Sequence, residues 1–177
     1  MMQAGAASAV INNDIGTDIQ GASVAQKVRE IRDDLEANAV LLSSEDESVL
    51  LVSCDVAAIE PEYVERFRNL MGDAARIDSR NVLIAGTHTH AGPSVIPTCY
   101  GKPLDEDYLD RLGGWLGSLA REAAGSVRPA QISLGIGEAR IGYNRRVCYA
   151  DGTHRMHKEG GRDDCDAALR TFLPVWP

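Results

Sequence analysis

Residues 81–93 read Asn-Val-Leu-Ile-Ala-Gly-Thr-His-Thr-His-Ala-Gly-Pro, and the fold is organised around this stretch. The short apolar run at residues 82–85 is typical of a buried strand, and Gly92-Pro93 is a turn signal that stops the chain from continuing straight. Gly86 has no side chain, so another segment or a ligand can approach the backbone closely there. The stretch therefore predicts a strand that ends at Gly86, where another segment or a ligand approaches its backbone.

Two histidines follow this strand directly. If the backbone stays extended through residues 87–90, His88 and His90 share one face while Thr87 and Thr89 point away. Neutral imidazoles that converge at a strand end suit a divalent metal ion, or one binds metal while the other exchanges protons with a substrate. Two ordinary hydrogen-bonded histidines are the alternative interpretation, and the pattern alone leaves both open.

Composition bounds the class of protein. A chain of 177 residues with 44% apolar and 25% charged residues is enough for one globular domain with a sizeable core. The net charge is −8 and the acidic residues are scattered, which argues against a nucleic-acid binder. The four cysteines are widely separated and form no C-x-x-C pair, so free thiols are favoured over a zinc ribbon or a redox motif.

The N-terminal residues 1–10 are small and apolar but lack a basic region, and they run into polar residues too early for a secretory signal peptide. No window approaches the roughly 18 apolar residues that a membrane span needs. These features predict a soluble, cytoplasmic protein.

The first third of the chain is expected to supply two or three strands. The Gly- and Asn-rich N-terminus predicts mostly loop, with one short strand around residues 9–11. Residues 24–42 fit both a helical stripe and an alternating pattern, and we favour an extended approach into a strand at residues 39–42. A charged turn and a second strand at residues 49–53 complete a hairpin. Asp55 comes directly after that strand, as a cap or as a partner of the histidines.

The remaining pattern predicts two helices, a further strand and a second hairpin. Pro61 suits the first turn of a helix, and a longer helix carries a continuous apolar stripe from Tyr108 to Ala123, with Asp105 to Asp107 before it and Gly125 after it. Residues 131–136 alternate in polarity like a strand. Asp151-Gly152 is a hairpin turn signal, and His154 and His157 beyond it are expected to be exposed. Strands separated by helices predict an α/β fold, a layered mixed β-sheet with flanking helices in a single domain.

The block at residues 81–93 resembles the Thr-His-Thr-His-Ser-Gly-Pro signature of the neutral/alkaline non-lysosomal ceramidases. Three further features fit the same template, namely residues 49–55, Tyr-Asn-Arg-Arg at 143–146 and the Asp-Gly turn at 151–152. The resemblance extends over about residues 5–161. It implies a zinc-dependent amidohydrolase that uses zinc-activated water to hydrolyse an N-acyl amide such as N-acylsphingosine.

The resemblance also implies roles for individual residues. His88 matches the histidine that ligates zinc, and His90 matches the one that faces the substrate and stabilises or protonates the transition state. Arg145 matches an arginine that contacts the reacting oxygen. The implied cofactor is Zn, and the implied partner is a small-molecule or lipid amide substrate, with no nucleic acid and no transmembrane segment.

Other parts of the family pattern are missing. There is no Phe-Ala-x-His-Pro-like segment for a second zinc histidine, the later glutamate and tyrosine ligands are absent, and Gly-Gly-Arg-Asp-Asp-Cys-Asp at residues 160–166 replaces a Gly-Pro-x-Asp-Pro-like stretch. We therefore expect residues 1–161 to be the N-terminal part of a catalytic domain, incomplete by itself, and residues 162–177 to be a divergent or truncated tail. A catalytically inactive α/β fragment or interaction module is the alternative.

Overall fold

The computed structural model describes residues 1–20, 26–97, 104–139, 146–148 and 153–156. It separates into two compact units, Met1–Ile132 and Ser133–Pro177, which are described here one at a time. The predicted boundary at residue 161 lies outside the described residues and stays a prediction.

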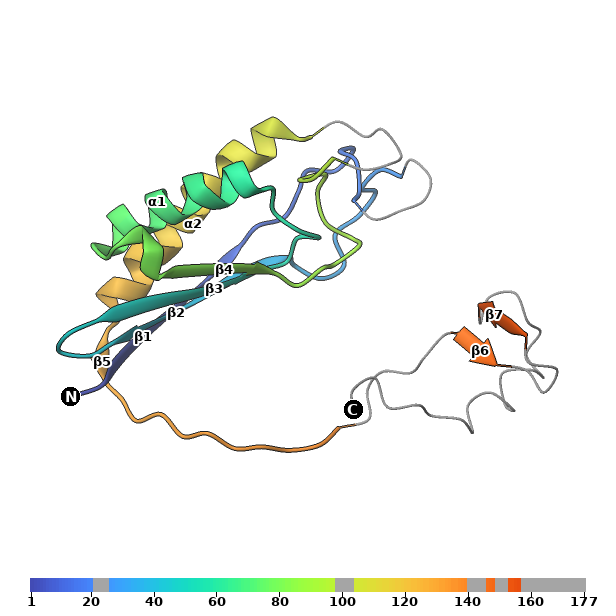
Figure 1. Ribbon diagram of the computed structural model, residues 1–177. Helices are drawn as coiled ribbons and strands as arrows, with labels where there is room; N and C mark the ends of the chain where they lie inside the picture. Colours follow the sequence, from blue (N-terminus) through green and yellow to red (C-terminus); the bar gives the residue numbers. More distant parts are fainter. Residues whose placement is uncertain (21–25, 98–103, 140–145, 149–152, 157–177) are drawn as a thin grey trace. The chain divides into compact units, whose positions relative to one another are not determined.

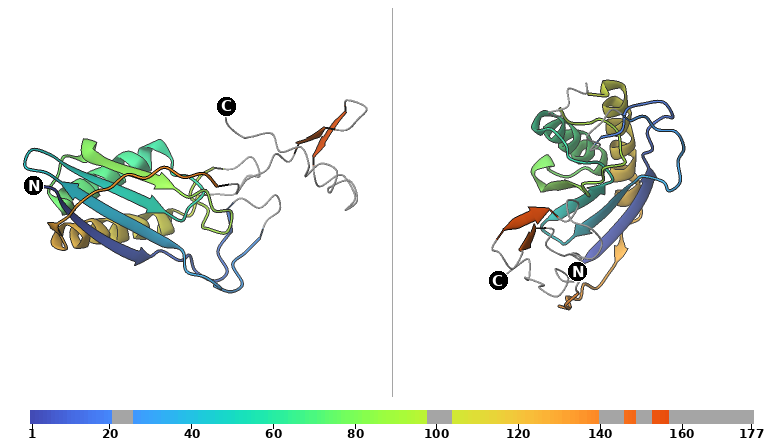
Figure 2. Two further views of the ribbon diagram at one scale, coloured as in Figure 1. Left: turned by 90° about the horizontal axis from the view of Figure 1, so that it is seen from below. Right: turned by 90° about the vertical axis from the view of Figure 1, so that its right-hand side faces the viewer.

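The first unit is a five-stranded mixed sheet with two helices against one of its faces, as Figures 1 and 2 show. The strands lie in the order β4-β3-β2-β1-β5, and only the β3–β4 pair is parallel. The predicted α/β fold with a mixed sheet is thus confirmed. The five strands are β1 (Gln3–Val10), β2 (Glu36–Ser43), β3 (Ser48–Cys54), β4 (Val82–Gly86) and β5 (Arg128–Pro129).

Both predicted helices are present, because their apolar residues recur at helical spacing and face the sheet. Helix α1 (Pro61–Ala75) starts with proline in its first turn and buries Phe67 and Met71. Helix α2 (Glu106–Gly125) starts at Asp105, whose side chain accepts a hydrogen bond from the backbone N–H of Tyr108 at 2.9 Å. No helix in the part of the chain that the structure describes is long and apolar enough to cross a membrane.

The N-terminal strand is longer than expected, because β1 spans eight residues rather than a few around residue 9. The small residues of β1 are weak strand formers. At Gly5 a small residue is needed because helix α2 packs closely against the strand. A Cβ added at Gly5 would lie 2.1 Å from the carbonyl oxygen of Ala123. The buried Tyr108 hydroxyl donates to the Ile11 carbonyl oxygen at 2.5 Å, which ties α2 to the chain just after β1.

The predicted hairpin of β2 and β3 is confirmed as an antiparallel pair in which Leu42 lies opposite Val49. Residues 26–35 before it form no helix, which agrees with the favoured extended interpretation. On the sheet face away from the helices, Val40, Leu51 and Leu83 lie opposite one another in a cross-strand row. They are 39%, 38% and 60% exposed, so this face of the sheet is apolar and open among the described residues.

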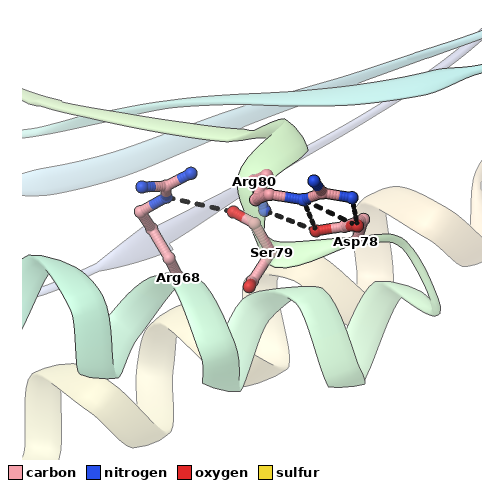
Figure 3. Close-up of polar contacts among 4 residues, drawn as sticks. All are labelled: Arg68, Asp78, Ser79 and Arg80. Atoms are coloured by element: carbon pink, nitrogen blue, oxygen red, sulfur yellow. Dashed lines mark hydrogen bonds and ion pairs between the residues drawn. The ribbon is translucent and has the colours of Figure 1, made fainter.

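The connection from α1 into β4 is fixed by two arginines (Figure 3). The short helix η1 (Ser79–Asn81) is capped by Asp78, whose carboxylate accepts from the Arg80 backbone N–H at 2.9 Å and from the Arg80 guanidinium at 2.6 Å. From α1, the Arg68 Nε donates to the Ser79 carbonyl oxygen at 3.0 Å. The hydrogen bonds from Arg80 lower the pKa of Asp78 to about 2. These contacts set where β4 begins.

The predicted strand at residues 131–136 is wrong. Strand β5 pairs with β1 only through Arg128 and Pro129. The Ala130 N–H then donates to the Met2 carbonyl oxygen at 3.1 Å, and the described chain has no further strand before β6. Leu134 and Ile136 are 92% and 96% exposed. An alternating sequence forms a strand only where a neighbouring backbone accepts its hydrogen bonds, and no described segment does so here.

The second unit contains a two-stranded antiparallel pair, β6 (Arg146–Cys148) and β7 (His154–Met156), with Val147 opposite Arg155. This pair confirms the predicted second hairpin. Its Asp151-Gly152 turn lies outside the described residues.

Candidate active site

The predicted histidine pair lies just beyond β4, which ends at Gly86. The backbone is not extended through this segment, because His88 has a φ of 65°, in the left-handed region. Nevertheless, the Nε2 atoms of His88 and His90 are 3.3 Å apart, and the rings meet edge to face at a centroid distance of 4.9 Å. The predicted convergence is present, but the expected extended backbone is wrong. Both side chains are exposed to solvent.

One ring nitrogen of His88 is held by the main chain. Its Nδ1 lies 2.7 Å from the carbonyl oxygen of Ala57. A carbonyl oxygen only accepts hydrogen bonds, so Nδ1 carries the proton, and the Nε2 of neutral His88 presents a lone pair. The Nε2 of His88 is also the nitrogen that faces His90. This orientation is what a metal-binding or proton-accepting imidazole needs.

The segment that follows β3 forms the other wall of this corner. The N–H of Thr87 donates to the Cys54 carbonyl oxygen at 2.9 Å, and the N–H of His88 donates to the Val56 carbonyl oxygen at 3.1 Å. A Cβ added at Gly86 would lie 2.9 Å from that same Val56 oxygen. The close backbone approach predicted at Gly86 is therefore present, and the approaching segment, at Val56 and Ala58, directly follows β3.

Asp55 joins the ends of three strands. Its Oδ1 accepts from the Thr87 hydroxyl at 2.9 Å, just after β4, and its Oδ2 accepts from the Glu36 N–H at 3.0 Å, at the start of β2. The Asp55 N–H in turn donates to the Glu36 carbonyl oxygen at 2.9 Å. Asp55 thus caps a backbone N–H, and it also holds the residue that precedes His88.

Cys54 lies beside this corner but is fully buried as a free thiol. Burial, with a smaller contribution from the neighbouring Asp55 charge, raises the pKa of Cys54 to about 12. A metal-binding cysteine is a thiolate. The Cys54 side chain is therefore a core residue rather than a donor to the histidine pair.

The two imidazoles fit part of a zinc site. Nitrogen ligands at about 2.0–2.1 Å from a tetrahedral zinc ion lie about 3.3–3.4 Å from each other. The 3.3 Å between the two Nε2 atoms matches this separation and equally fits an N–H···N hydrogen bond from His90 to His88. Among the described residues, no group of three or more His, Cys, Asp or Glu side chains is arranged to hold a metal.

The other candidate residues are not placed. Arg145 and His157 lie outside the described residues, and for His154 only the backbone of β7 is described. The role of Arg145 therefore stays a prediction.

A wide cleft of about 1170 Å³ reaches the histidine segment, although neither His88 nor His90 lines it. Thr89 and Ala91, the two neighbours of His90 in the chain, lie in its wall, and most of the rest comes from residues 26–35. This lining is rich in charged side chains, including Lys27, Arg29 and Asp33. The cleft is large enough to admit a small molecule next to Thr89 and Ala91.

The roles of two residues that support this corner were not predicted from the sequence. Thr87 was expected to point away from the site, and it does so by bonding Asp55, which makes it part of the support of His88. The Ala57 carbonyl that fixes the ring of His88 belongs to the backbone. A backbone acceptor that is 31 residues from its donor leaves no signal in the residue types.

Comparison with solved structures shows what fold the chain has. No protein-family model matches the chain, and no curated protein shows a significant match. The crystal structure of neutral ceramidase from Pseudomonas aeruginosa is similar, with a TM-score of 0.62 at 18% identity over 72% of this chain and 22% of that chain. A ceramidase complexed with C2 gives a TM-score of 0.59 at 17% identity, with the same shares covered. The chain has a ceramidase-like fold and spans about a fifth of the length of these structures.

Proposed function

We propose that this chain is the N-terminal part of a ceramidase-like zinc amidohydrolase. The observation that carries the proposal is the pair of imidazoles that converge at the end of β4, on a fold shared with neutral ceramidases. The signature at residues 81–93 supports it, because the two histidines of that signature are the two that meet. Residues 1–161 are proposed as the ceramidase-like portion.

In this proposal His88 binds the metal. His88 is the zinc ligand, since its Nδ1 proton is held by the Ala57 carbonyl and its Nε2 presents a lone pair toward His90. Zinc, when bound, supplies a Lewis acid that polarises an amide carbonyl and lowers the pKa of water. The remaining ligands are not among the described residues, so only a part of the coordination is assigned.

His90 and Arg145 would act on the substrate. An amide passes through a tetrahedral intermediate whose oxygen gains negative charge, and a fixed imidazole or guanidinium stabilises that charge. The Nε2 of His90 is 3.3 Å from that of His88, so it lies within reach of a group bound at His88. The adjoining cleft is the proposed entry for an N-acyl amide, small or lipid-like.

Zinc stoichiometry tests the proposal. We expect a protein that contains this chain and the complete ligand set to bind zinc at neutral pH, measured by elemental analysis after dialysis, and its His88→Ala variant to lose it. His154→Ala is the matched control, because it removes a histidine that the proposal does not use. Zinc retained by His88→Ala, or lost equally in both variants, would contradict the assignment.

Hydrolysis is tested separately on N-acylsphingosine and on shorter N-acyl amides, with release of the free amine as the readout. We expect activity to require His90 and Arg145 in the protein that contains the complete ligand set. Full activity in a His90→Ala variant of that protein would contradict the role given to His90.

A further inference from the structure

The histidine pair is supported by a side-chain link between Asp55 and Thr87, just before His88. The Asp55 carboxylate contacts Thr87 on one side and the Glu36 backbone on the other, at 2.9 and 3.0 Å. Thr87 is the residue directly before His88, and its own N–H bonds the Cys54 carbonyl. Thr87 is therefore held at both its backbone and its hydroxyl.

This link matters because His88 has an unfavourable backbone conformation. A φ of 65° is uncommon for a residue with a side chain, and such conformations persist where surrounding contacts hold them. The contacts that hold His88 are its N–H to Val56, its Nδ1 to Ala57 and the anchored Thr87 before it. If Thr87 were released, the turn could relax toward the extended region, and the Nδ1 contact would be the one to break.

We propose that Asp55 and Thr87 are positioning residues that fix the direction of the His88 Nε2 lone pair. They do so by anchoring the left-handed turn that brings Nδ1 to the Ala57 carbonyl. The inference rests on the proposed zinc site, but it also predicts a property of the metal-free chain. In that chain, Nδ1–H is the dominant tautomer of His88.

Substitution of Thr87 removes the link to Asp55 while leaving the charge of the Asp55 carboxylate in place. Thr87→Val keeps the shape and removes the hydroxyl, and Thr87→Ser restores a hydroxyl. Thr89→Val is the matched control, because Thr89 follows the same histidine and, among the described residues, its hydroxyl accepts from the Ala91 N–H at 3.3 Å and does not contact Asp55. Asp55→Ala removes the other end of the link.

Zinc affinity is the first readout. It is measured in the protein that contains the complete ligand set, by titration against a competing chelator at a temperature where circular dichroism shows each variant folded. Loss of a group that orients a metal-binding histidine typically weakens metal binding about 10–100-fold. We expect that loss in Thr87→Val and Asp55→Ala, and affinity within about threefold of the parent in Thr87→Ser and Thr89→Val. The double variant Thr87→Val/Asp55→Ala should lose little more zinc affinity than either single variant, since both substitutions break the same hydrogen bond.

The second readout needs no metal. Long-range ¹H–¹⁵N spectra report which ring nitrogen of His88 carries the proton, and we expect a single Nδ1–H form in the parent and a mixture in Thr87→Val. An unchanged tautomer together with unchanged zinc affinity in Thr87→Val would overturn the inference. If the parent binds no zinc, the proposed function fails, and the spectra alone still decide whether Asp55 and Thr87 position His88.

Discussion

Replacing Gly86 by alanine tests whether the close approach of β4 to the segment after β3 builds the candidate site. The new methyl group would lie 2.9 Å from the Val56 carbonyl oxygen and 3.5 Å from the Ala58 Cα. The first distance is shorter than ordinary contacts, and both partners are backbone atoms, so the segment must move. The displaced oxygen is also the acceptor of the His88 N–H, at 3.1 Å.

The cost follows from these contacts. Adding a methyl group to a tightly packed position destabilises a protein by about 1–3 kcal/mol. Restricting the unfolded chain by the Gly→Ala change returns about 0.4–1 kcal/mol, because Gly86 does not have a positive φ. We expect the free energy of unfolding to fall by about 1–2 kcal/mol, which at an m-value of about 1–3 kcal/mol per molar lowers the urea midpoint by roughly 0.3–2 M.

Equilibrium urea unfolding, followed by circular dichroism, measures this change. Gly114→Ala is the matched control, since nothing lies within 4 Å of a Cβ at that position in α2 and alanine is the better helix former. That variant should gain about 0.5–1 kcal/mol. A Gly86→Ala protein as stable as the parent would refute the argument that the two backbones are in closest contact there.

Four other outcomes are expected. Gly5→Ala should be more destabilising than Gly86→Ala in the same urea assay, because its methyl group would lie 2.1 Å from the Ala123 carbonyl oxygen. Tyr108→Phe should lower the free energy of unfolding by about 1–2 kcal/mol, since it leaves the buried Ile11 carbonyl without its donor. Cys54, whose pKa is raised to about 12, should resist iodoacetamide at pH 8 in the folded chain and react after unfolding, as site-resolved mass spectrometry would show. Asp78 stabilises the fold in its ionised form, because its pKa is lowered from 3.8 to about 2. Its contribution to the free energy of unfolding is complete above about pH 4 and is lost as the pH falls toward 2. The parent should therefore lose stability more steeply than Asp78→Asn over this pH range in an acid titration.

The elements with strong local patterns could be predicted from the sequence. Helix α2 follows from its apolar stripe and its acidic first turn, and the β2–β3 hairpin follows from alternation and a charged turn. Strand β1 could not be predicted in full, because alanine and glycine carry little strand preference and are required only by the distant helix α2. The segment at residues 131–136 shows the opposite failure, since its pattern is strand-like but no described strand pairs with it.

The candidate site was predictable in part for the same reason. The presence of His88 and His90 at a strand end is a local property, and their convergence was predicted. The backbone that brings them together was not, because the φ of His88 is set by Ala57, Val56 and Asp55, which are distant in the sequence. Contacts of this kind belong to the fold and are not encoded in the neighbours of a residue.

The contacts of Asp55 also determine when the candidate site forms during folding. Its two side-chain bonds join residues 19 and 32 positions apart, and the bond that orients His88 spans 31. Contacts between distant residues form late because the loops between them must close first. The β2–β3 hairpin is local and can pair early, whereas the turn at His88 is completed only when α1 has folded and β4 has docked. A ligand of this pair would therefore select the fully paired sheet, and it would raise the stability of the whole first unit rather than of one loop.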